Sequence, residues 1–301
     1  MPATSDAYAR LSAVFPGLRI THAAPPASAG WLPAAELARG GPATARFVAG
    51  DVRRVGGAHG VPPRPDAAAA LALHRYLWPA CLLFTVPWFL HRRVPRLPVA
   101  DVAFHPIDGH FSVRVREFAC LPGDDAELLP GARTVAGPAA LREELRTALA
   151  EHVDPVLAAF APLVRRHPHA LRRQATDEIA EGLWYIARLL GEERRAVAEL
   201  TELLPEGARF RRADRTPAPA APGTAAPGSA AAPTGPCDSA SASGATAGSA
   251  AEAGSAPASG SAPVRDRLTC CLFYTVSPGD TCAGCPRTRR GPAIRRPART
   301  R

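Results

Sequence analysis

The feature that most constrains the fold is a tract of Ala, Pro, Gly, Ser and Thr over residues 216–263. Its 48 residues include no aromatic residue and no Leu, Ile or Val, so it cannot bury enough apolar surface to order itself. It predicts a flexible linker with a root-mean-square span of roughly 35–40 Å. We therefore divide the chain into a folded domain (1–212), a disordered linker (213–263), a small cysteine-bearing module (264–290) and a basic tail (291–301).

Composition limits the function classes. The 301 residues are 47% apolar, enough for one large core beside a small module. All 36 basic residues are arginines within a composition rich in Ala, Pro and Gly, so much of the net charge of +9 reflects a general composition bias. The charge is concentrated over residues 286–301, with seven arginines and no acid. Such a tail is attracted to any polyanion, and a solvated tail is the favoured interpretation over nucleic-acid binding.

The sequence favours a cytoplasmic protein. Residues 1–10 lack the basic and apolar regions of a secretory signal. The most apolar stretch, residues 76–90, is interrupted by Pro79 and Pro87 and is shorter than the ~20 residues of a spanning helix. It predicts a buried core segment. Seven cysteines, four of them clustered, do not resemble a secreted disulfide framework. These features are also compatible with peripheral contact of the protein with the inner face of the membrane.

The first domain is predicted to be mostly helical, from apolar residues spaced by three or four and from Pro and Gly at the ends. In the first part of the domain, helices are predicted from Ser5, over 34–39, over 42–55, and over 67–78 after the N-cap Asp66. A further helix carries Leu141, Leu145 and Leu149, and a new one is predicted to start at Asp154-Pro155. The last two helices run from Leu171 to Leu190, before Gly191, and over 197–203.

One segment has the period of a strand. Residues 102–104 and 111–115 flank Pro106-Ile107-Asp108-Gly109, and alternation in the second run predicts a β-hairpin. The predicted fold class is mainly α with a small antiparallel β-hairpin or sheet (α+β), without a βαβ pattern. A small iron–sulfur or zinc module would follow the linker.

The cysteines of the C-terminal block have the spacing C-C-x10-C-x2-C, formed by Cys270, Cys271, Cys282 and Cys285. Two residues between Cys282 and Cys285 allow a tight turn, in which Gly284 accepts a positive φ. Residues 272–276 have strand propensity, which would point the first two cysteines to opposite sides, and a turn at 278–280 would bring the two pairs together.

The spacing alone leaves the bound group open. Four thiolates suit a [2Fe-2S] or [4Fe-4S] cluster and also structural zinc, and unligated or disulfide-bonded cysteines are a third alternative. Zinc sites usually have two C-x2-C pairs, and here there is one. Adjacent cysteines suit a two-iron cluster, whose ligands need not converge on one atom.

The block resembles the C-terminal motif of the FhuF-like ferric-siderophore reductases. The shared features are the cysteine spacing, Arg267 upstream, Leu272 and Tyr274 after the first pair, a Pro-Gly turn, and Gly284. Residues 30–205 are similar in outline through Trp31, the apolar stretch 71–90, the hairpin and Leu-Trp-Tyr at 183–185. The linker is longer than is usual in the family, and Thr275 stands where relatives often have a basic residue.

The resemblance implies a [2Fe-2S] cluster as cofactor, with Cys270, Cys271, Cys282 and Cys285 as its metal ligands. It further implies an oxidoreductase that reduces a ferric siderophore by one electron and releases ferrous iron in the cytosol. The alternatives are a zinc module with a nucleic-acid-binding tail, and a [2Fe-2S] electron carrier or sensor.

We expect an external electron donor, a ferredoxin or a reductase. The sequence has no G-x-G-x-x-G turn and no P-loop, which predicts no nicotinamide or flavin site. The glycine-rich residues 56–60 have the wrong spacing and predict a surface loop.

Other residues with chemical potential have plainer explanations. The histidines considered as pocket-lining residues or ferrous-iron ligands, against surface or capping roles, are His74, His91, His105 and His110. Arg92 and Arg93 could steer an anionic complex. Cys81 is predicted to be a buried apolar residue, and Cys120 and Cys237 to be free. The aromatic residues predicted to belong to the core are Trp78, Trp88, Trp184 and Tyr185.

Overall fold

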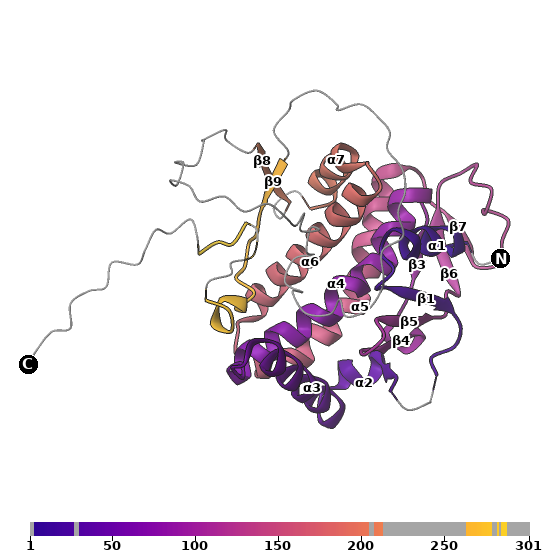
Figure 1. Ribbon diagram of the computed structural model, residues 1–301. Helices are drawn as coiled ribbons and strands as arrows, with labels where there is room; N and C mark the ends of the chain where they lie inside the picture. Colours follow the sequence, from indigo (N-terminus) through magenta and orange to yellow (C-terminus); the bar gives the residue numbers. More distant parts are fainter. Residues whose placement is uncertain are drawn as a thin grey trace, which may run out of the picture.

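The structure is a computed structural model of the full chain (Figure 1). The residues that it describes are 3–26, 30–204, 208–212, 263–278, 282 and 284–287. The interior of the predicted linker, Cys237 within it, and the arginine-rich tail after Arg287 lie outside these residues. The described residues therefore include most of the helical domain and most of the segment that carries the cysteines.

The described part of the chain is mainly helical, as the periodicity predicts. Its α-helices are α1 (Ser5–Val14), α2 (Ala34–Arg39), α3 (Pro42–His59), α4 (Pro65–His91), α5 (Pro138–Val164), α6 (Pro168–Leu189) and α7 (Glu193–Leu203). Two short 3-10 helices are η1 (Val99–Asp101) and η2 (Phe273–Thr275). The predicted helices near Ser5, Pro33, Leu171 and Val197 are confirmed, and Gly191 has the expected positive φ of 74° after α6.

Helix α4 is the centre of the fold and packs against α1, α3, α5 and α6 (Figure 1). The prediction that its helix ends at Trp78 is wrong, because α4 continues through Pro79 and Pro87 to His91. Each interior proline costs about 3 kcal/mol in an isolated helix, but here nearly every side chain is buried on all sides. Tertiary packing thus outweighs the local penalty, and the apolar stretch is a core segment as predicted.

Helix α5 shows the same effect. The expected restart at Asp154-Pro155 is wrong, since one helix runs from Pro138 to Val164 through Pro155 and Pro162. Its buried residues Val153, Val156 and Phe160 keep the helical register across the proline and pack into the main core. Apolar residues with one continuous register therefore override the local stop signal.

Two helices are long and apolar enough to span a membrane by length and composition, namely α4 and α5. In α4, 89% of the most apolar window is buried inside the protein, which is the pattern of a core helix. In α5 the buried share is 44%. Such segments are weak evidence for a membrane protein, because the core of a globular protein passes the same test.

The sheets are small and lie beside the helices. The predicted hairpin is confirmed as β4 (Val102–His105) and β5 (His110–Val113), with Gly109 at a φ of 61° in the turn. It is extended to a four-stranded sheet in the order β1-β5-β4-β2 by β1 (Arg19–His22) and β2 (Leu32–Pro33). A second sheet has the order β3-β6-β7, formed by β3 (Val94–Arg96), β6 (Glu117–Cys120) and β7 (Ala132–Thr134). The predicted β4–β5 pair is antiparallel, whereas the β1–β5 and β6–β7 pairs, which the sequence did not predict, are parallel.

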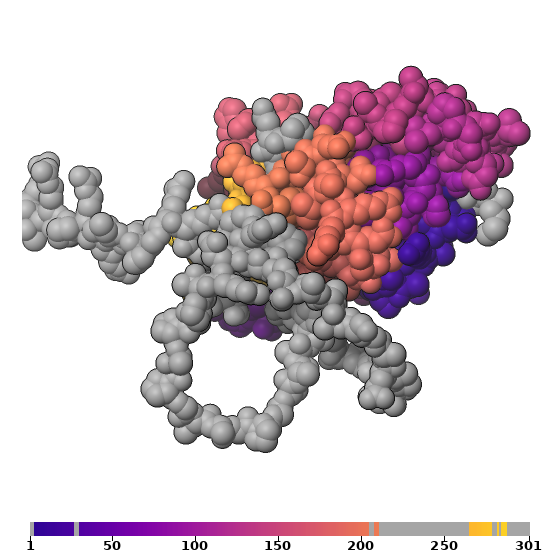
Figure 2. Space-filling model, turned by 90° about the horizontal axis from the view of Figure 1, so that it is seen from above, coloured from indigo at the N-terminus to yellow at the C-terminus, as the bar shows by residue number. Residues whose placement is uncertain are grey.

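A third sheet joins the two ends of the linker. Strand β8 (Arg209–Arg212) pairs antiparallel with β9 (Pro263–Asp266), and Arg212 lies opposite Pro263. From above, the orange residues of α7 and β8 lie between the indigo N-terminal segment and the gold C-terminal segment (Figure 2). The residues on either side of the linker, Arg212 and Pro263, are therefore neighbours on adjacent strands. The cysteine-bearing module begins next to the end of the helical domain.

This pairing predicts that the linker can be shortened. Replacing residues 213–262 with Asn-Gly, a two-residue hairpin turn, should stabilise the protein by roughly 2–3 kcal/mol, because closing a linker that the sequence predicts to be flexible costs more entropy than closing a short turn. Urea unfolding followed by tryptophan fluorescence measures the change, and iron content measures the integrity of the module. A variant with the same 50 residues scrambled should be unchanged. Loss of bound iron in the shortened variant would contradict the paired geometry.

Candidate metal centre

The cysteine-bearing segment is docked on the helical domain rather than separate from it. In Figure 1 it lies, in gold, beside α6 and the adjoining ends of α3 and α4. Two of its arginines, Arg265 and Arg267, are 2% and 3% exposed, which is unusual for arginine. Buried charges need partners, and α6 supplies them.

Asp177 on α6 is the main anchor. Its carboxylate is fully buried and accepts hydrogen bonds from Arg265 Nη2 at 2.5 Å and from the backbone N–H groups of Leu268 and Thr269 at 2.9 and 2.8 Å. The Thr269 hydroxyl donates a further bond at 2.7 Å. Charge-assisted bonds of this kind are the stronger class in proteins. One side chain thus fixes the backbone immediately before the first cysteine pair.

Two further carboxylates of α6 complete the charge cluster. Glu181 accepts a hydrogen bond from Arg265 Nη1 at 2.7 Å, and Glu178 lies 3.6 Å from Arg267 Nη2. The other oxygen of Glu178 is 2.7 Å from His74 Nδ1 on α4. His74, one of the histidines considered for a pocket, therefore contacts a carboxylate that also flanks Arg267.

The opposite side of the contact is apolar. Cys271, Phe273 and Val276 form a small buried cluster with Val55 of α3 and Leu71 of α4. The His59 ring also meets the Phe273 ring edge-on, with centroids 5.4 Å apart. His59 ends α3, so the prediction of a surface loop over residues 56–60 is wrong. The segment is the last turn of a helix, closed by Gly60 at a φ of 70° and positioned against the module.

The second cysteine pair forms the predicted tight turn. The N–H of Cys285 donates to the carbonyl of Cys282 at 3.1 Å, and Gly284 between them has a φ of 68°. A Cβ on Gly284 would lie 2.0 Å from the Arg265 carbonyl oxygen. Glycine is therefore required at this position both by the left-handed backbone and by the close approach of the neighbouring strand.

The first pair is followed by a turn instead of the expected strand. Leu272 has a φ of 67°, rare for a branched side chain, and residues 273–275 form η2. The prediction of a strand over 272–276 is wrong because this turn buries Phe273 against α3. It also directs the Leu272 N–H toward the Cys270 sulfur, where it acts to lower the pKa of that thiol.

The sulfurs from the two pairs come together. Cys271 Sγ and Cys282 Sγ are 3.7 Å apart, and Cys271 and Cys285 are 3% and 2% exposed. Burial raises the pKa of the Cys270 thiol, and the neighbouring Cys271 and Cys285 raise it further, while Arg166 acts in the opposite direction. Close buried thiols resist becoming thiolates together unless a metal supplies positive charge, so metal binding would release protons here.

The approach of the two pairs is made by one cysteine from each, Cys271 and Cys282. Within the described ranges, no group of three or more His, Cys, Asp or Glu side chains is placed to hold a single metal ion. A tetrahedral zinc site needs all four ligands around one point, whereas each iron of a two-iron cluster needs only two thiolates. The approach of Cys271 and Cys282 is compatible with both kinds of site.

Comparison with known families agrees with this geometry. Residues 267–287 match the model of the FhuF 2Fe-2S C-terminal domain. The cysteine-bearing segment therefore contains an FhuF-like [2Fe-2S] C-terminal motif. Its cofactor is a [2Fe-2S] cluster. No curated protein and no solved structure was found to match the chain.

The residues around the site fit such a cluster. The FhuF-like motif offers four cysteine sulfurs, which is the ligand number of a [2Fe-2S] centre. Beside them, the buried Arg267 guanidinium has no hydrogen-bond acceptor for Nε, Nη1 or Nη2 among the described residues. Arg166 Nη2 donates to the Cys270 carbonyl at 2.7 Å and orients the loop from the turn between α5 and α6. When bound, a [2Fe-2S] cluster supplies one electron at a time.

The remaining histidines and arginines lie away from the cysteines. His105 and His110 face each other across the hairpin, and both contact the Trp31 ring, with centroids 5.5 and 5.0 Å away. Arg92 pairs with Glu199, and Arg93 is bonded to Asp124, so both tie loops and helices of the fold together.

Other expectations concern the core. Cys81 is fully buried in the main core, as predicted, and Cys120 is a free buried cysteine in a small cluster with Phe118. The aromatic residues Trp78, Trp88 and Trp184 are buried, and Tyr185 packs against the same core. His91 ends α4 and is half-buried.

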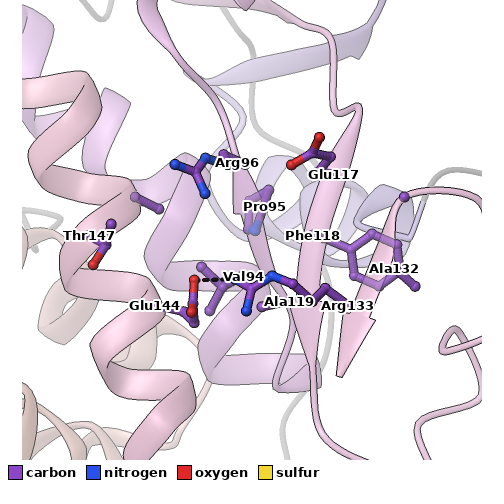
Figure 3. A pocket seen from close by; sticks show the side chains of 12 residues that line it. Val94, Pro95, Arg96, Glu117, Phe118, Ala119, Ala132, Arg133, Glu144 and Thr147 are labelled. Atoms are coloured by element: carbon purple, nitrogen blue, oxygen red, sulfur yellow. Dashed lines mark ion pairs between the residues drawn. The ribbon is translucent and has the colours of Figure 1, made fainter. Parts of the chain in front are cut away.

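A separate cavity of about 380 Å³ lies between β3, β6, β7 and α5 (Figure 3). Its lining includes Phe118 and Ala119 of β6, the charged residues Arg96 and Glu117, and the ion pair of Arg133 with Glu144. None of its lining residues belongs to the C-terminal module. Because its arginines are paired with Glu144 and Glu151, the cavity presents no strong net charge to a ligand.

Sequence reasoning missed the carboxylates that anchor the module. They belong to a stripe of buried polar residues at helical spacing, formed by Gln174, Asp177, Glu178 and Glu181. This stripe runs beside the apolar stripe that we used to predict α6. Polar residues that repeat every three or four positions on a helix with a separate apolar face were the available signal for a second, polar interface.

We expect Gly284→Ala to damage the site specifically. The substitution forces a Cβ toward the Arg265 carbonyl in a left-handed backbone, so the protein should lose at least about 2 kcal/mol of stability and most of its bound iron. Gly57→Ala is the matched control, because a Cβ there meets nothing within 4 Å in a helix and should be neutral or slightly stabilising. Equal iron content in the two variants would show that Gly284 does not shape the site.

Removing the Asp177 carboxylate should undock the module. Asp177→Ala leaves two backbone donors and part of the Arg265 guanidinium without acceptors, a loss of about 3–5 kcal/mol for a broken buried pair. Iron content and the melting temperature should both fall, whereas Asp154→Asn, an exposed change on α5, should leave them unaltered. An unchanged melting temperature for Asp177→Ala would contradict the anchoring role.

Proposed function

We propose that this protein is a cytoplasmic oxidoreductase that reduces ferric siderophores by one electron, with its cluster held by Cys270, Cys271, Cys282 and Cys285. The observation that carries the proposal is the match of residues 267–287 to the FhuF 2Fe-2S C-terminal domain, together with the convergence of the two cysteine pairs on one face of the helical domain. The siderophore and reductase parts rest on the family relation.

The site offers both protection and access. Cys271 and Cys285 are buried, while Cys270 and Cys282 are half-buried and so partly accessible to solvent. Tyr274, close in sequence to the first cysteine pair, is half-buried, and the Arg287 guanidinium lies 3.9 Å from the centroid of its ring. An electron acceptor can approach the two half-buried cysteines without any rearrangement of the helical domain. The positive charge of Arg287 and the backbone-bonded Arg166 favours acceptors with negative groups.

The chemistry of the substrate explains why one electron suffices. Oxygen donors such as hydroxamates and catecholates are hard ligands that prefer ferric to ferrous iron. One electron added to the complex converts Fe(III) to Fe(II), and the ferrous ion then dissociates from the siderophore. An external donor, a ferredoxin or a reductase, returns one electron to the protein for each turnover. Nothing in this scheme requires a nucleotide site in the chain itself.

Reoxidation kinetics test the reductase function. Protein reduced with dithionite and freed of excess reductant is mixed anaerobically with ferric siderophores and a ferrous chelator, and the visible spectrum is followed. We expect reoxidation well above the buffer rate, with one Fe(II) trapped per electron stored. A cluster that reoxidises no faster with siderophores than in buffer would remove the reductase function and leave an electron carrier or sensor.

Single cysteine variants test the ligand set. Replacing any one of Cys270, Cys271, Cys282 and Cys285 with Ala should abolish or strongly reduce the iron and acid-labile sulfide content of anaerobically purified protein, because one of the two irons would lose one of its two thiolates. Cys120→Ala and Cys237→Ala are the controls and should retain two irons per chain. A full cluster in any of the four variants would show that the cysteine in question is not a ligand.

Metal content also separates the iron–sulfur protein from the zinc alternative. A colourless protein with one zinc per chain and no electron paramagnetic resonance signal after reduction would contradict both the cluster and the reductase function. The arginine-rich tail that motivated nucleic-acid binding lies outside the described residues, so no structural observation favours that role.

A further inference from the structure

Arg267 is the least satisfied charge near the metal centre. Its side chain is 1% exposed, yet Nε, Nη1 and Nη2 have no hydrogen-bond acceptor in the described part of the chain. Its carboxylate neighbours are at long range, with Glu178 at 3.6 Å and Glu181 at 3.9 Å. Buried polar groups in proteins are almost always hydrogen-bonded, and exceptions call for a specific partner.

The electrostatic surroundings point to the cysteines as that partner. Burial acts to lower the pKa of Arg267, but the negative charges of Glu178, Glu181 and Asp177, and of the Cys271 thiolate, outweigh it and raise the pKa further. Arg267 therefore stays charged and lies within electrostatic range of a predicted cluster ligand. The backbone also ties Arg267 to the cysteine loop, because its N–H donates to the carbonyl of Gly284, the residue before Cys285, at 3.2 Å.

Arg265 provides an internal comparison. It is two residues away, equally buried, and paired with carboxylates of the same helix. Each of its Nη atoms has a carboxylate acceptor, Asp177 at 2.5 Å and Glu181 at 2.7 Å, and Nε alone lacks one among the described residues. Arg265 is thus an anchor, whereas Arg267 has the same burial but keeps its donors available.

We propose that Arg267 is the residue that sets the reduction potential of the centre, by donating N–H···S hydrogen bonds to the sulfurs there and by placing a buried positive charge beside Cys271. It is a positioning residue and not a ligand. Hydrogen bonds to sulfur and nearby charge are two levers by which proteins tune iron–sulfur centres. A positive charge favours the state that carries one more electron, so Arg267 raises the potential. The inference rests on the cysteine ligation proposed above but not on the reductase activity.

The test compares two arginines and two properties. The reduction potentials of Arg267→Gln and Arg267→Lys are measured by redox titration monitored by electron paramagnetic resonance, with Arg265→Lys as the matched control. In Arg267→Gln the equilibrium constant for one-electron reduction should fall at least tenfold, which is about 59 mV. Arg267→Lys, which keeps the charge, should recover part of that loss. Arg265→Lys should lower the iron content yet leave the potential of the loaded fraction unchanged.

A second measurement uses the unmodified protein, so that a variant that fails to load its cluster does not end the test. Protein grown with 15N-arginine is reduced and examined by pulsed electron paramagnetic resonance. We expect a 15N coupling that persists in Arg166→Lys, Arg287→Lys and Arg265→Lys, which replace other arginines near the loop. Absence of an arginine coupling, or an unchanged potential in a loaded Arg267→Gln, overturns the proposal. Absence of any cluster instead contradicts the ligation proposed above.

Discussion

The metal centre depends on one buried charge interaction, in which carboxylates of α6 hold two arginines of the C-terminal segment. Asp177 and Glu181 bind Arg265 directly, and Glu178 and Glu181 flank Arg267 at longer range. A segment this short lies below the roughly 40 residues at which chains fold alone without metals or other staples. Buried ion pairs contribute little net stability, but an unpaired buried charge is very costly, so the network fixes one position for the segment.

This docking makes the cluster site part of the helical domain. Three parts of the helical domain contact the cysteine-bearing segment. They are the last turns of α3 at Val55 and His59, the first part of α4 at Leu71, and the turn between α5 and α6 at Arg166. Strands β8 and β9 bring the linker ends together, so its length does not separate the centre from the core. The helical domain can therefore influence the solvent access and electrostatics of the cluster, which are the properties that set its potential.

The sequence predicted the existence and type of most elements, but not the points where tertiary packing overrides local signals. Apolar spacing predicted α6 and α7, and the Asp-Gly turn predicted the β4–β5 hairpin. Prolines in α4 and α5 suggested breaks that the packed core does not allow. Strand propensity over residues 272–276 was misleading because the left-handed Leu272 turns the chain so that Phe273 is buried against α3.

By itself, the sequence determined the ligand residue types, their spacing and the need for glycine at position 284, because these depend on neighbours only a few residues away. The family motif, 267–287, is equally local. Only the tertiary structure decided where that motif lies and what surrounds it. Its anchoring bonds join residues 84 to 92 positions apart, and no local pattern specifies such pairs. The unsatisfied donors of Arg267 follow from the same long-range packing.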